Sequence, residues 1–108
     1  MDQKSTGERI VDFWNNQAEW SRATFGSDQE RGPEGPLKHL AKEVQECLDS
    51  PYDSMEYADM LFLIFDASRR SGITLEKLIN DAEIKLSINK ARKWNKPTTS
   101  EPVEHVRE

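Results

Sequence analysis

Apolar residues in this chain recur at the spacing of an α-helix, and no stretch shows the strict alternation of a half-buried β-strand. Residues 36–48 give the cleanest case, because their apolar side chains form one continuous stripe along a helix. The stripe consists of Leu37, Leu40, Ala41, Val44 and Leu48. Similar patterns over residues 6–23, 53–72 and 74–95 complete a set of four helices. The sequence therefore predicts an all-α fold that resembles a four-helix bundle.

Helix-breaking residues mark the ends of these segments. Glycine and proline interrupt residues 25–35, Gly72 ends the third segment and Pro97 stops the fourth. Residues 97–108 form a polar tail without a core pattern. Because there is no internal repeat and no shift in composition, we predict a single domain over residues 1–108.

Two pairs of acidic residues lie on either side of the turn between the second and third predicted helices. The members of each pair are three residues apart, so both carboxylates of a pair share one helical face. If the two helices fold back on each other, four carboxylates converge, and hard oxygen ligands of this kind suit Mg²⁺ or Mn²⁺. The candidate ligands are Glu43, Glu46, Glu56 and Asp59.

Asp59 is the candidate that the sequence supports best. It directly precedes the run Met60–Phe65, which is apolar on every side and predicts a buried helix. An ionised carboxylate in such a helix is costly unless it is paired or bound to metal, and the i+3 and i+4 neighbours of Asp59 are apolar. Asp66, by contrast, has Arg70 one turn further on, which predicts an ordinary salt bridge.

The alternative is that the acidic residues are solvated surface groups. Glu43 and Glu46 are predicted on the side of their helix opposite to the apolar stripe, and Lys42 can pair with Glu46 at i, i+4. Glu56 can serve in a capping box with Asp53. The pattern of acidic residues alone leaves both interpretations open.

A row of basic and amide side chains follows one face of the fourth predicted helix. It consists of Lys85, Asn89, Arg92 and Lys96, with Lys93 beside it. Such a row offers charge and directional donors to phosphate oxygens. The alternative is a solvated basic helix end, which the helix dipole favours. No P-loop sequence is present. Acids that hold a cation and a row that holds phosphates together indicate a nucleotide-phosphate site.

The composition limits the classes of protein to which the chain can belong. Of its 108 residues, 35% are hydrophobic and 32% charged, and so modest a core favours oligomerisation. The net charge of −5 argues against binding to nucleic acid or to an anionic membrane. Cys47 is the only cysteine, no apolar run is long enough to span a bilayer, and the N-terminus lacks a signal-peptide pattern. We therefore expect a soluble, cytoplasmic protein.

Three blocks of the sequence resemble a known family. They are residues 35–46 (GPLKHLAKEVQE), 56–59 (EYAD) and 85–94 (KLSINKARKW). In this order they are similar to the dATP/dGTP pyrophosphohydrolase branch of the MazG-related all-α NTP pyrophosphohydrolases. That branch is common in bacteriophages and includes the MazZ enzymes. The resemblance covers about residues 20–106.

The resemblance implies a metal-dependent hydrolase of dGTP, dATP or both, with a role in phage nucleotide-pool remodelling. Water would attack the α-phosphorus, giving the monophosphate and pyrophosphate. The four acidic residues would be catalytic and would bind two or three Mg²⁺ or Mn²⁺ ions. The phosphates would be held by Lys85, Asn89, Arg92 and Lys93. Because family members are dimers or tetramers, a homodimer or homotetramer is implied.

Aromatic and amide side chains are the candidates for contacts with the base, since rings stack on a base and amides hydrogen-bond its exocyclic groups. These candidates are Trp14, Asn15, Asn16, Trp20, Phe25 and Trp94, of which the aromatic ones are equally candidates for core residues. The sequence does not fix the base, so a pyrimidine (dUTP or dCTP) pyrophosphohydrolase stays open. A nucleotide binder without turnover and a non-catalytic helical interaction module are further alternatives.

Overall fold

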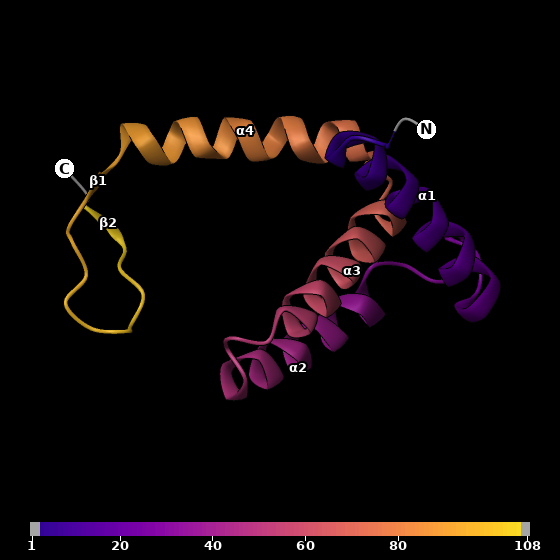
Figure 1. The fold of residues 1–108 in the computed structure, drawn as a ribbon, viewed down its shortest axis with the longest axis horizontal. Helices are drawn as coiled ribbons and strands as arrows, with labels where there is room; N and C mark the ends of the chain where they lie inside the picture. Colours follow the sequence, from indigo (N-terminus) through magenta and orange to yellow (C-terminus); the bar gives the residue numbers. More distant parts are fainter. Residues whose placement is uncertain (1–2, 107–108) are drawn as a thin grey trace. The chain divides into compact units, whose positions relative to one another are not determined.

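The computed structural model describes residues 3–106. Its helices are α1 (Thr6–Phe25), α2 (Glu34–Asp49), α3 (Ser54–Arg70) and α4 (Leu75–Ala91), and its short strands are β1 (Lys93–Trp94) and β2 (His105–Val106) (Figure 1). The four predicted helices are thereby confirmed. Contacts divide the chain into two compact units, one ending at Leu75 and the other beginning at Glu76. The single domain over residues 1–108 stays a prediction.

Helix α1 begins and ends at residues suited to helix termini. The Ser5 hydroxyl accepts a hydrogen bond from the Glu8 amide at 3.1 Å, and the Glu8 carboxylate accepts one from the Ser5 amide at 3.2 Å. This reciprocal pair is a capping box. At the other end Gly26 has φ 111°, a value that side chains strongly disfavour, so glycine lets the chain leave the helix there. The helix continues two residues beyond the predicted end at Ala23.

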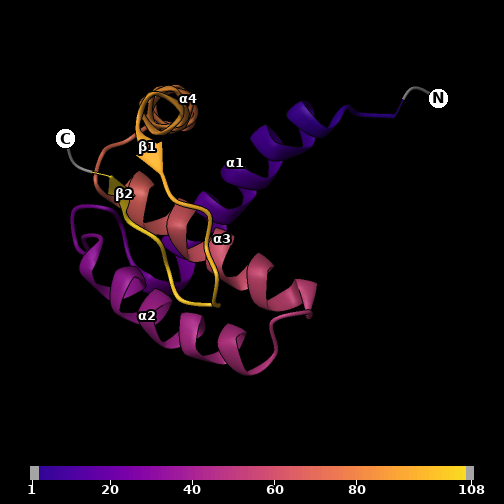
Figure 2. The same cartoon turned by 90° about the vertical axis from the view of Figure 1, so that its left-hand side faces the viewer.

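Helices α2 and α3 lie side by side and antiparallel, joined by the turn at residues 50–53 (Figures 1 and 2). Asp53 caps α3 by accepting a hydrogen bond from the Met55 amide at 3.0 Å. The predicted partner of Asp53, the Glu56 carboxylate, instead lies near Glu43 and Glu46 of α2. The hairpin therefore brings together the two acidic pairs that the sequence separates.

Helix α1 packs on α3 mainly through aromatic rings. The ring centroids of Trp14 and Phe65 are 5.1 Å apart, and those of Phe13 and Phe65 are 5.8 Å apart. Phe62 lies one helical turn before Phe65, and the centroids of its ring and of the Trp20 ring are 5.6 Å apart. Edge-to-face ring pairs at such distances add to the stabilisation that burial provides.

A buried polar network joins the same two helices. The Asp66 carboxylate accepts hydrogen bonds from the Ser21 hydroxyl at 2.7 Å, from Arg69 at 2.8 Å and from Arg70 at 3.3 Å. The predicted pair of Asp66 with Arg70 is therefore present. It is not an ordinary surface salt bridge, however, because both residues are buried. The sequence missed the contribution of Ser21, since its partner lies 45 residues away.

Most of the apolar stripe of α2 lies on the surface of the first unit. Leu48 is 67% exposed and Leu37 and Val44 are about half exposed, whereas Glu43 is only 9% exposed. Helix α3 packs instead on the face of α2 that carries Glu43 and Cys47, and both of these residues are buried. Periodicity therefore identifies the apolar stripe of α2, but it does not identify the face of α2 that packs on α3.

The apolar run of α3 is likewise only partly buried. Leu63 and Phe65 are in the interior, whereas Leu61 and Ile64 are more than 40% exposed. The prediction of a helix buried on every side is therefore wrong for the first unit. The exposed side chains of both helices leave an apolar surface on the unit.

The second unit consists of α4 and a two-stranded antiparallel ribbon. Lys93 pairs with Val106 and Trp94 with His105. Helix α4 ends at Ala91 rather than at residues 94–95, and the tail returns to pair with β1 instead of lacking structure throughout. The sequence missed this ribbon because two-residue strands carry no readable periodicity.

Helix α4 has no buried residue, although the helical pattern over residues 74–95 predicts a core stripe of Leu75, Leu78, Ile79, Ala82 and Leu86. Among the described residues, no helix is sufficiently long and apolar to cross a bilayer.

Candidate metal and nucleotide site

Three of the four predicted ligands converge between α2 and α3. One carboxylate oxygen from each of Glu43, Glu46 and Glu56 lies within 4.8 Å of the other two. Helical spacing places the first two on neighbouring turns of α2, and the antiparallel return of the chain places the third opposite them. The interpretation of these acids as unrelated surface groups does not explain why they gather at one point.

The electrostatics of the cluster favour a bound cation. A hydrogen bond shared with Glu46 raises the pKa of Glu43 above its ordinary value, and burial and neighbouring acids act in the same direction. Burial raises the pKa of Glu56, as do the charges of Glu46 and Asp59. Ionised carboxylates only accept hydrogen bonds, so each of them disfavours the charge of the others. A divalent cation among them removes this repulsion.

Two buried oxygens of the cluster lack a partner, which is the observation that fits a metal best. They are Oε2 of Glu43 and Oε2 of Glu56. Leaving such atoms unsatisfied is costly, and carboxylate oxygens are the donors that Mg²⁺ and Mn²⁺ prefer. The residues present therefore fit a divalent ion.

Asp59 differs from its prediction. It is exposed rather than buried, so the argument that burial demands a metal does not hold for it. Its charge nevertheless acts on the pKa values of Glu43 and Glu56, because it lies one helical turn from Glu56 on α3. The apolar run that follows Asp59 does not reveal this exposure, because only some of its side chains, such as Leu63 and Phe65, are buried. Its role as a ligand stays a prediction.

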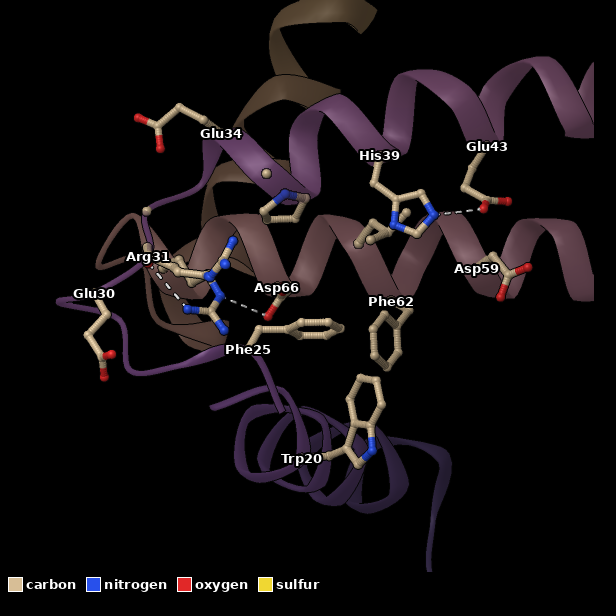
Figure 3. A pocket seen from close by; sticks show the side chains of 15 residues that line it. Trp20, Phe25, Glu30, Arg31, Glu34, His39, Glu43, Asp59, Phe62 and Asp66 are labelled. Atoms are coloured by element: carbon tan, nitrogen blue, oxygen red, sulfur yellow. Dashed lines mark hydrogen bonds and ion pairs between the residues drawn. The ribbon is translucent and has the colours of Figure 1, made fainter. Parts of the chain in front are cut away.

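A pocket of about 1000 Å³ adjoins the cluster within the first unit. Figure 3 shows Glu43 and Asp59 on one side of it, and the rings of Trp20, Phe25 and Phe62 along another wall. The Trp20 and Phe25 rings meet edge to face with centroids 5.5 Å apart. The pocket thus places an aromatic surface beside a carboxylate cluster.

Two of the predicted base contacts, Trp20 and Phe25, line this pocket. Trp14 packs on Phe65 in the interior, Asn15 is exposed on α1, and Trp94 belongs to the second unit. The indole nitrogen of Trp94 donates a hydrogen bond to the Asn89 carbonyl at 2.8 Å. Contact of any of these residues with a base stays a prediction.

Phe62 and His39 are among the pocket residues that the sequence did not indicate as part of a site. Phe62 was assigned to the apolar run of α3, and nothing in that run distinguishes a ring that lines a pocket from one in the core. His39 precedes Glu43 by four residues on α2, a spacing at which side chains meet, and this was the available signal. Its Nε2 lies 3.1 Å from Oε1 of Glu43.

The basic row lies in the second unit. Lys85 is exposed on α4, Arg92 follows the end of that helix, and Lys93 begins β1. Asn89 is half-buried on the last turn of α4. The basic row thus lies along α4, at its end and on the adjoining strand β1. Binding of phosphate by these residues stays a prediction.

The helical hairpin offers carboxylate oxygens to a divalent cation beside an aromatic surface on which a base can stack. The sequence profile of the dATP/dGTP pyrophosphohydrolase family matches residues 13–108, and the chain belongs to this family. The resemblance seen in the sequence is thereby confirmed, as is the helical fold class.

Two known proteins extend this assignment. The chain is 50% identical over 91 residues to the Eaa protein of Salmonella phage P22, a match that covers 84% of this chain and 28% of that protein. The chain therefore spans little more than a quarter of that relative. It is also similar to the cyanophage S-2L MazG-like pyrophosphohydrolase bound to dGDP and three catalytic Mn²⁺ ions per active site, with a TM-score of 0.71 and 25% identity. That match covers 92% of this chain and 94% of the other.

Proposed function

We propose that this protein hydrolyses purine deoxynucleoside triphosphates, dGTP or dATP or both, to the monophosphate and pyrophosphate. The observation that carries the proposal is the convergence of carboxylate oxygens from Glu43, Glu46 and Glu56 within 4.8 Å, beside an aromatic pocket. Membership of the dATP/dGTP pyrophosphohydrolase family and the dGDP bound to the cyanophage enzyme support a purine nucleotide.

Two or three Mg²⁺ or Mn²⁺ ions are the proposed cofactors. Divalent ions held there supply positive charge to the phosphate oxygens and make water a better nucleophile toward the α-phosphorus. The proposed protein ligands, which are also the proposed catalytic residues, are Glu43, Glu46, Glu56 and Asp59. The unpartnered oxygens of Glu43 and Glu56 and the Mn²⁺ ions of the cyanophage enzyme support this assignment.

The remaining contacts follow from the chemistry of the side chains. Trp20 and Phe25 stack on the base, with Phe62 as a third ring of the same pocket. Trp14, Asn15 and Trp94 remain candidates for the base without a contact that favours them. The phosphates are held by Lys85, Asn89, Arg92 and Lys93, whose charged and amide donors suit phosphate oxygens.

We further propose a homodimer or homotetramer formed by one domain, acting in the cytoplasm of a bacterial host. The exposed apolar stripe of α2 supports the oligomer, because monomeric proteins rarely expose continuous apolar patches. The phage relative supports the location. The net charge of −5 favours neither nucleic acid nor an anionic membrane as a partner.

A panel of nucleotides tests the substrate. The purified protein is incubated with each dNTP and NTP in the presence of Mg²⁺ or Mn²⁺, and the products are separated by ion-exchange chromatography. Faster turnover of dGTP or dATP than of dCTP and dUTP supports the proposal. Preference for a pyrimidine would make the protein a pyrimidine pyrophosphohydrolase, and binding without products would make it a nucleotide binder.

A further inference from the structure

We propose that His39 is a positioning residue of the metal site, whose ring N–H fixes the Glu43 carboxylate so that Oε2 points to the cation. The inference rests on the proposed function, since it assigns a role within the carboxylate cluster. It goes beyond that function because it concerns a residue that is not itself a ligand.

The geometry of one helical turn carries the inference. His39 and Glu43 are four residues apart on α2, and Nε2 of the ring lies 3.1 Å from Oε1 of the carboxylate (Figure 3). An ionised carboxylate can only accept a hydrogen bond, so Nε2 carries the proton and donates it. Both residues line the same pocket.

The two oxygens of Glu43 have different surroundings. Oε1 accepts the hydrogen bond from His39, whereas Oε2 is buried without a partner. Holding one oxygen restricts the rotation of the carboxylate and leaves Oε2 without a protein donor. Hydrogen-bonded partners of metal ligands orient the ligands in this way, and their loss typically weakens metal binding by about 10- to 100-fold.

A role in packing does not account for the pair. The side chain of His39 is 59% exposed, while that of Glu43 is 12% exposed. Replacement of the ring removes little buried surface, so the fold should tolerate it. An effect of substitution on metal affinity then reports on the carboxylate rather than on folding.

The test is Mn²⁺ binding without nucleotide at fixed pH. The electron paramagnetic resonance signal of free Mn²⁺ measures the binding. His39→Ala is expected to weaken binding by about 10-fold or more. His39→Gln, whose amide N–H can occupy the place of Nε2–H, should restore binding to within about 3-fold of the unmodified protein. Lys38→Ala, an exposed neighbour on α2, serves as the control and should leave binding unchanged.

Unchanged affinity in His39→Ala, or equal weakening in His39→Gln, would overturn the inference. Electron spin echo spectra of bound Mn²⁺ should lack the ¹⁴N coupling of a directly bound imidazole, and its presence would make His39 a ligand instead. Failure of the proposed function is distinguishable, since the nucleotide panel measures turnover whereas this test measures Mn²⁺ binding without nucleotide. Mn²⁺ binding that depends on Glu56 but not on His39 would contradict this inference alone.

Discussion

Glu43 and Glu56 show most clearly that the site is not optimised for stability. Both are drawn between two helices, both have a buried oxygen without a partner, and both have a raised pKa. Burial of like charges opposes folding, so a protein without a use for the cluster gains nothing from it. Such conflicts between stability and local chemistry are typical of functional sites.

The first prediction at the residue scale is a trade between stability and metal binding. Glu56→Gln keeps the shape of the side chain but removes one of the converging charges. We expect the metal-free variant to melt at the same or a higher temperature, because repulsion within the cluster falls. Its Mn²⁺ affinity and dGTP hydrolysis should fall by more than about 100-fold, which exceeds the usual effect of removing a group that only hydrogen-bonds a metal ligand.

The matched control is Glu83→Gln, which removes an exposed acid of α4. Circular dichroism in EDTA measures the melting temperature, and the release of products measures the rate of dGTP hydrolysis. A Glu56→Gln protein that melts lower while hydrolysing dGTP normally would mean that Glu56 is a structural residue.

The pH dependence of stability divides into two branches of opposite sign. The raised pKa values of Glu43 and Glu56 mean that the folded state binds protons more tightly than the unfolded state, whose carboxyls titrate near 4.5. Their contribution is full below that value and is lost as the pH rises through the folded pKa. Metal-free protein should therefore gain stability on mild acidification from neutral pH.

Asp66 and Asp28 act in the opposite direction. Burial by itself raises the pKa of Asp66, but its interactions with Gln17, Ser21 and Arg69 outweigh this and hold the pKa below 3.8. A hydrogen bond from Arg22 lowers the pKa of Asp28. Both acids stabilise the fold above pH 3.8. This stabilisation is lost as the pH falls through the pKa values that the two acids have in the folded state. Urea unfolding at a series of pH values in EDTA should show a maximum, whereas a monotonic rise toward acid would contradict the account.

At the scale of elements, Arg70 joins α3 to the loop that bounds the pocket. Its guanidinium donates to the carbonyls of Gly26, Ser27 and Arg31 at 3.2–3.3 Å and to the Asp66 carboxylate. One side chain thus fixes residues 26–31 against the end of α3. The planar fork of arginine spreads five N–H donors over several acceptors, whereas a lysine has three donors on a single nitrogen.

Arg70→Ala should lower the free energy of unfolding by about 3–5 kcal/mol, because Asp66 loses one of its two arginine partners and three carbonyls of residues 26–31 lose their donor. Arg70→Lys should recover only part of the loss. Arg9→Ala, which removes an exposed arginine from α1, serves as the control. Urea denaturation measures all three variants, and a loss below about 1 kcal/mol for Arg70→Ala would mean that the network is dispensable.

The elements also show what a sequence can and cannot predict. The start of α1 and the turn before Asp53 follow from local capping and breaking residues, so they were predictable. The face of α2 that meets α3 was not, since periodicity identifies the stripe with Leu48 but not the surface that covers it. The convergence of Glu56 with Glu43 followed from spacing plus an antiparallel turn, whereas the exposure of Asp59 depends on where α1 packs.

At the scale of the whole molecule, the exposed apolar side chains of α2 connect the fold to assembly. Val44→Glu and Leu48→Glu place charge on the stripe without touching the carboxylate cluster. If copies of the chain associate through this face, both variants should shift the protein toward the monomer, because burying an unpaired charge is costly. Multi-angle light scattering after size exclusion measures the mass.

Gln45→Glu is the matched control, because it adds the same charge beside the stripe on an exposed residue of α2. An unmodified protein that is an oligomer and stays one in both stripe variants would assign assembly to another surface. An unmodified protein that is monomeric would show that the apolar face is not used for self-association.

The central claim concerns which bond of the nucleotide is broken, and an isotope decides it. The protein hydrolyses dGTP in H₂¹⁸O with Mn²⁺, and mass spectrometry locates the label. Attack of water on the α-phosphorus puts ¹⁸O into dGMP and leaves the pyrophosphate unlabelled, which is the predicted result. Label in pyrophosphate or in orthophosphate, or no cleavage of any dNTP with either metal, would contradict the account.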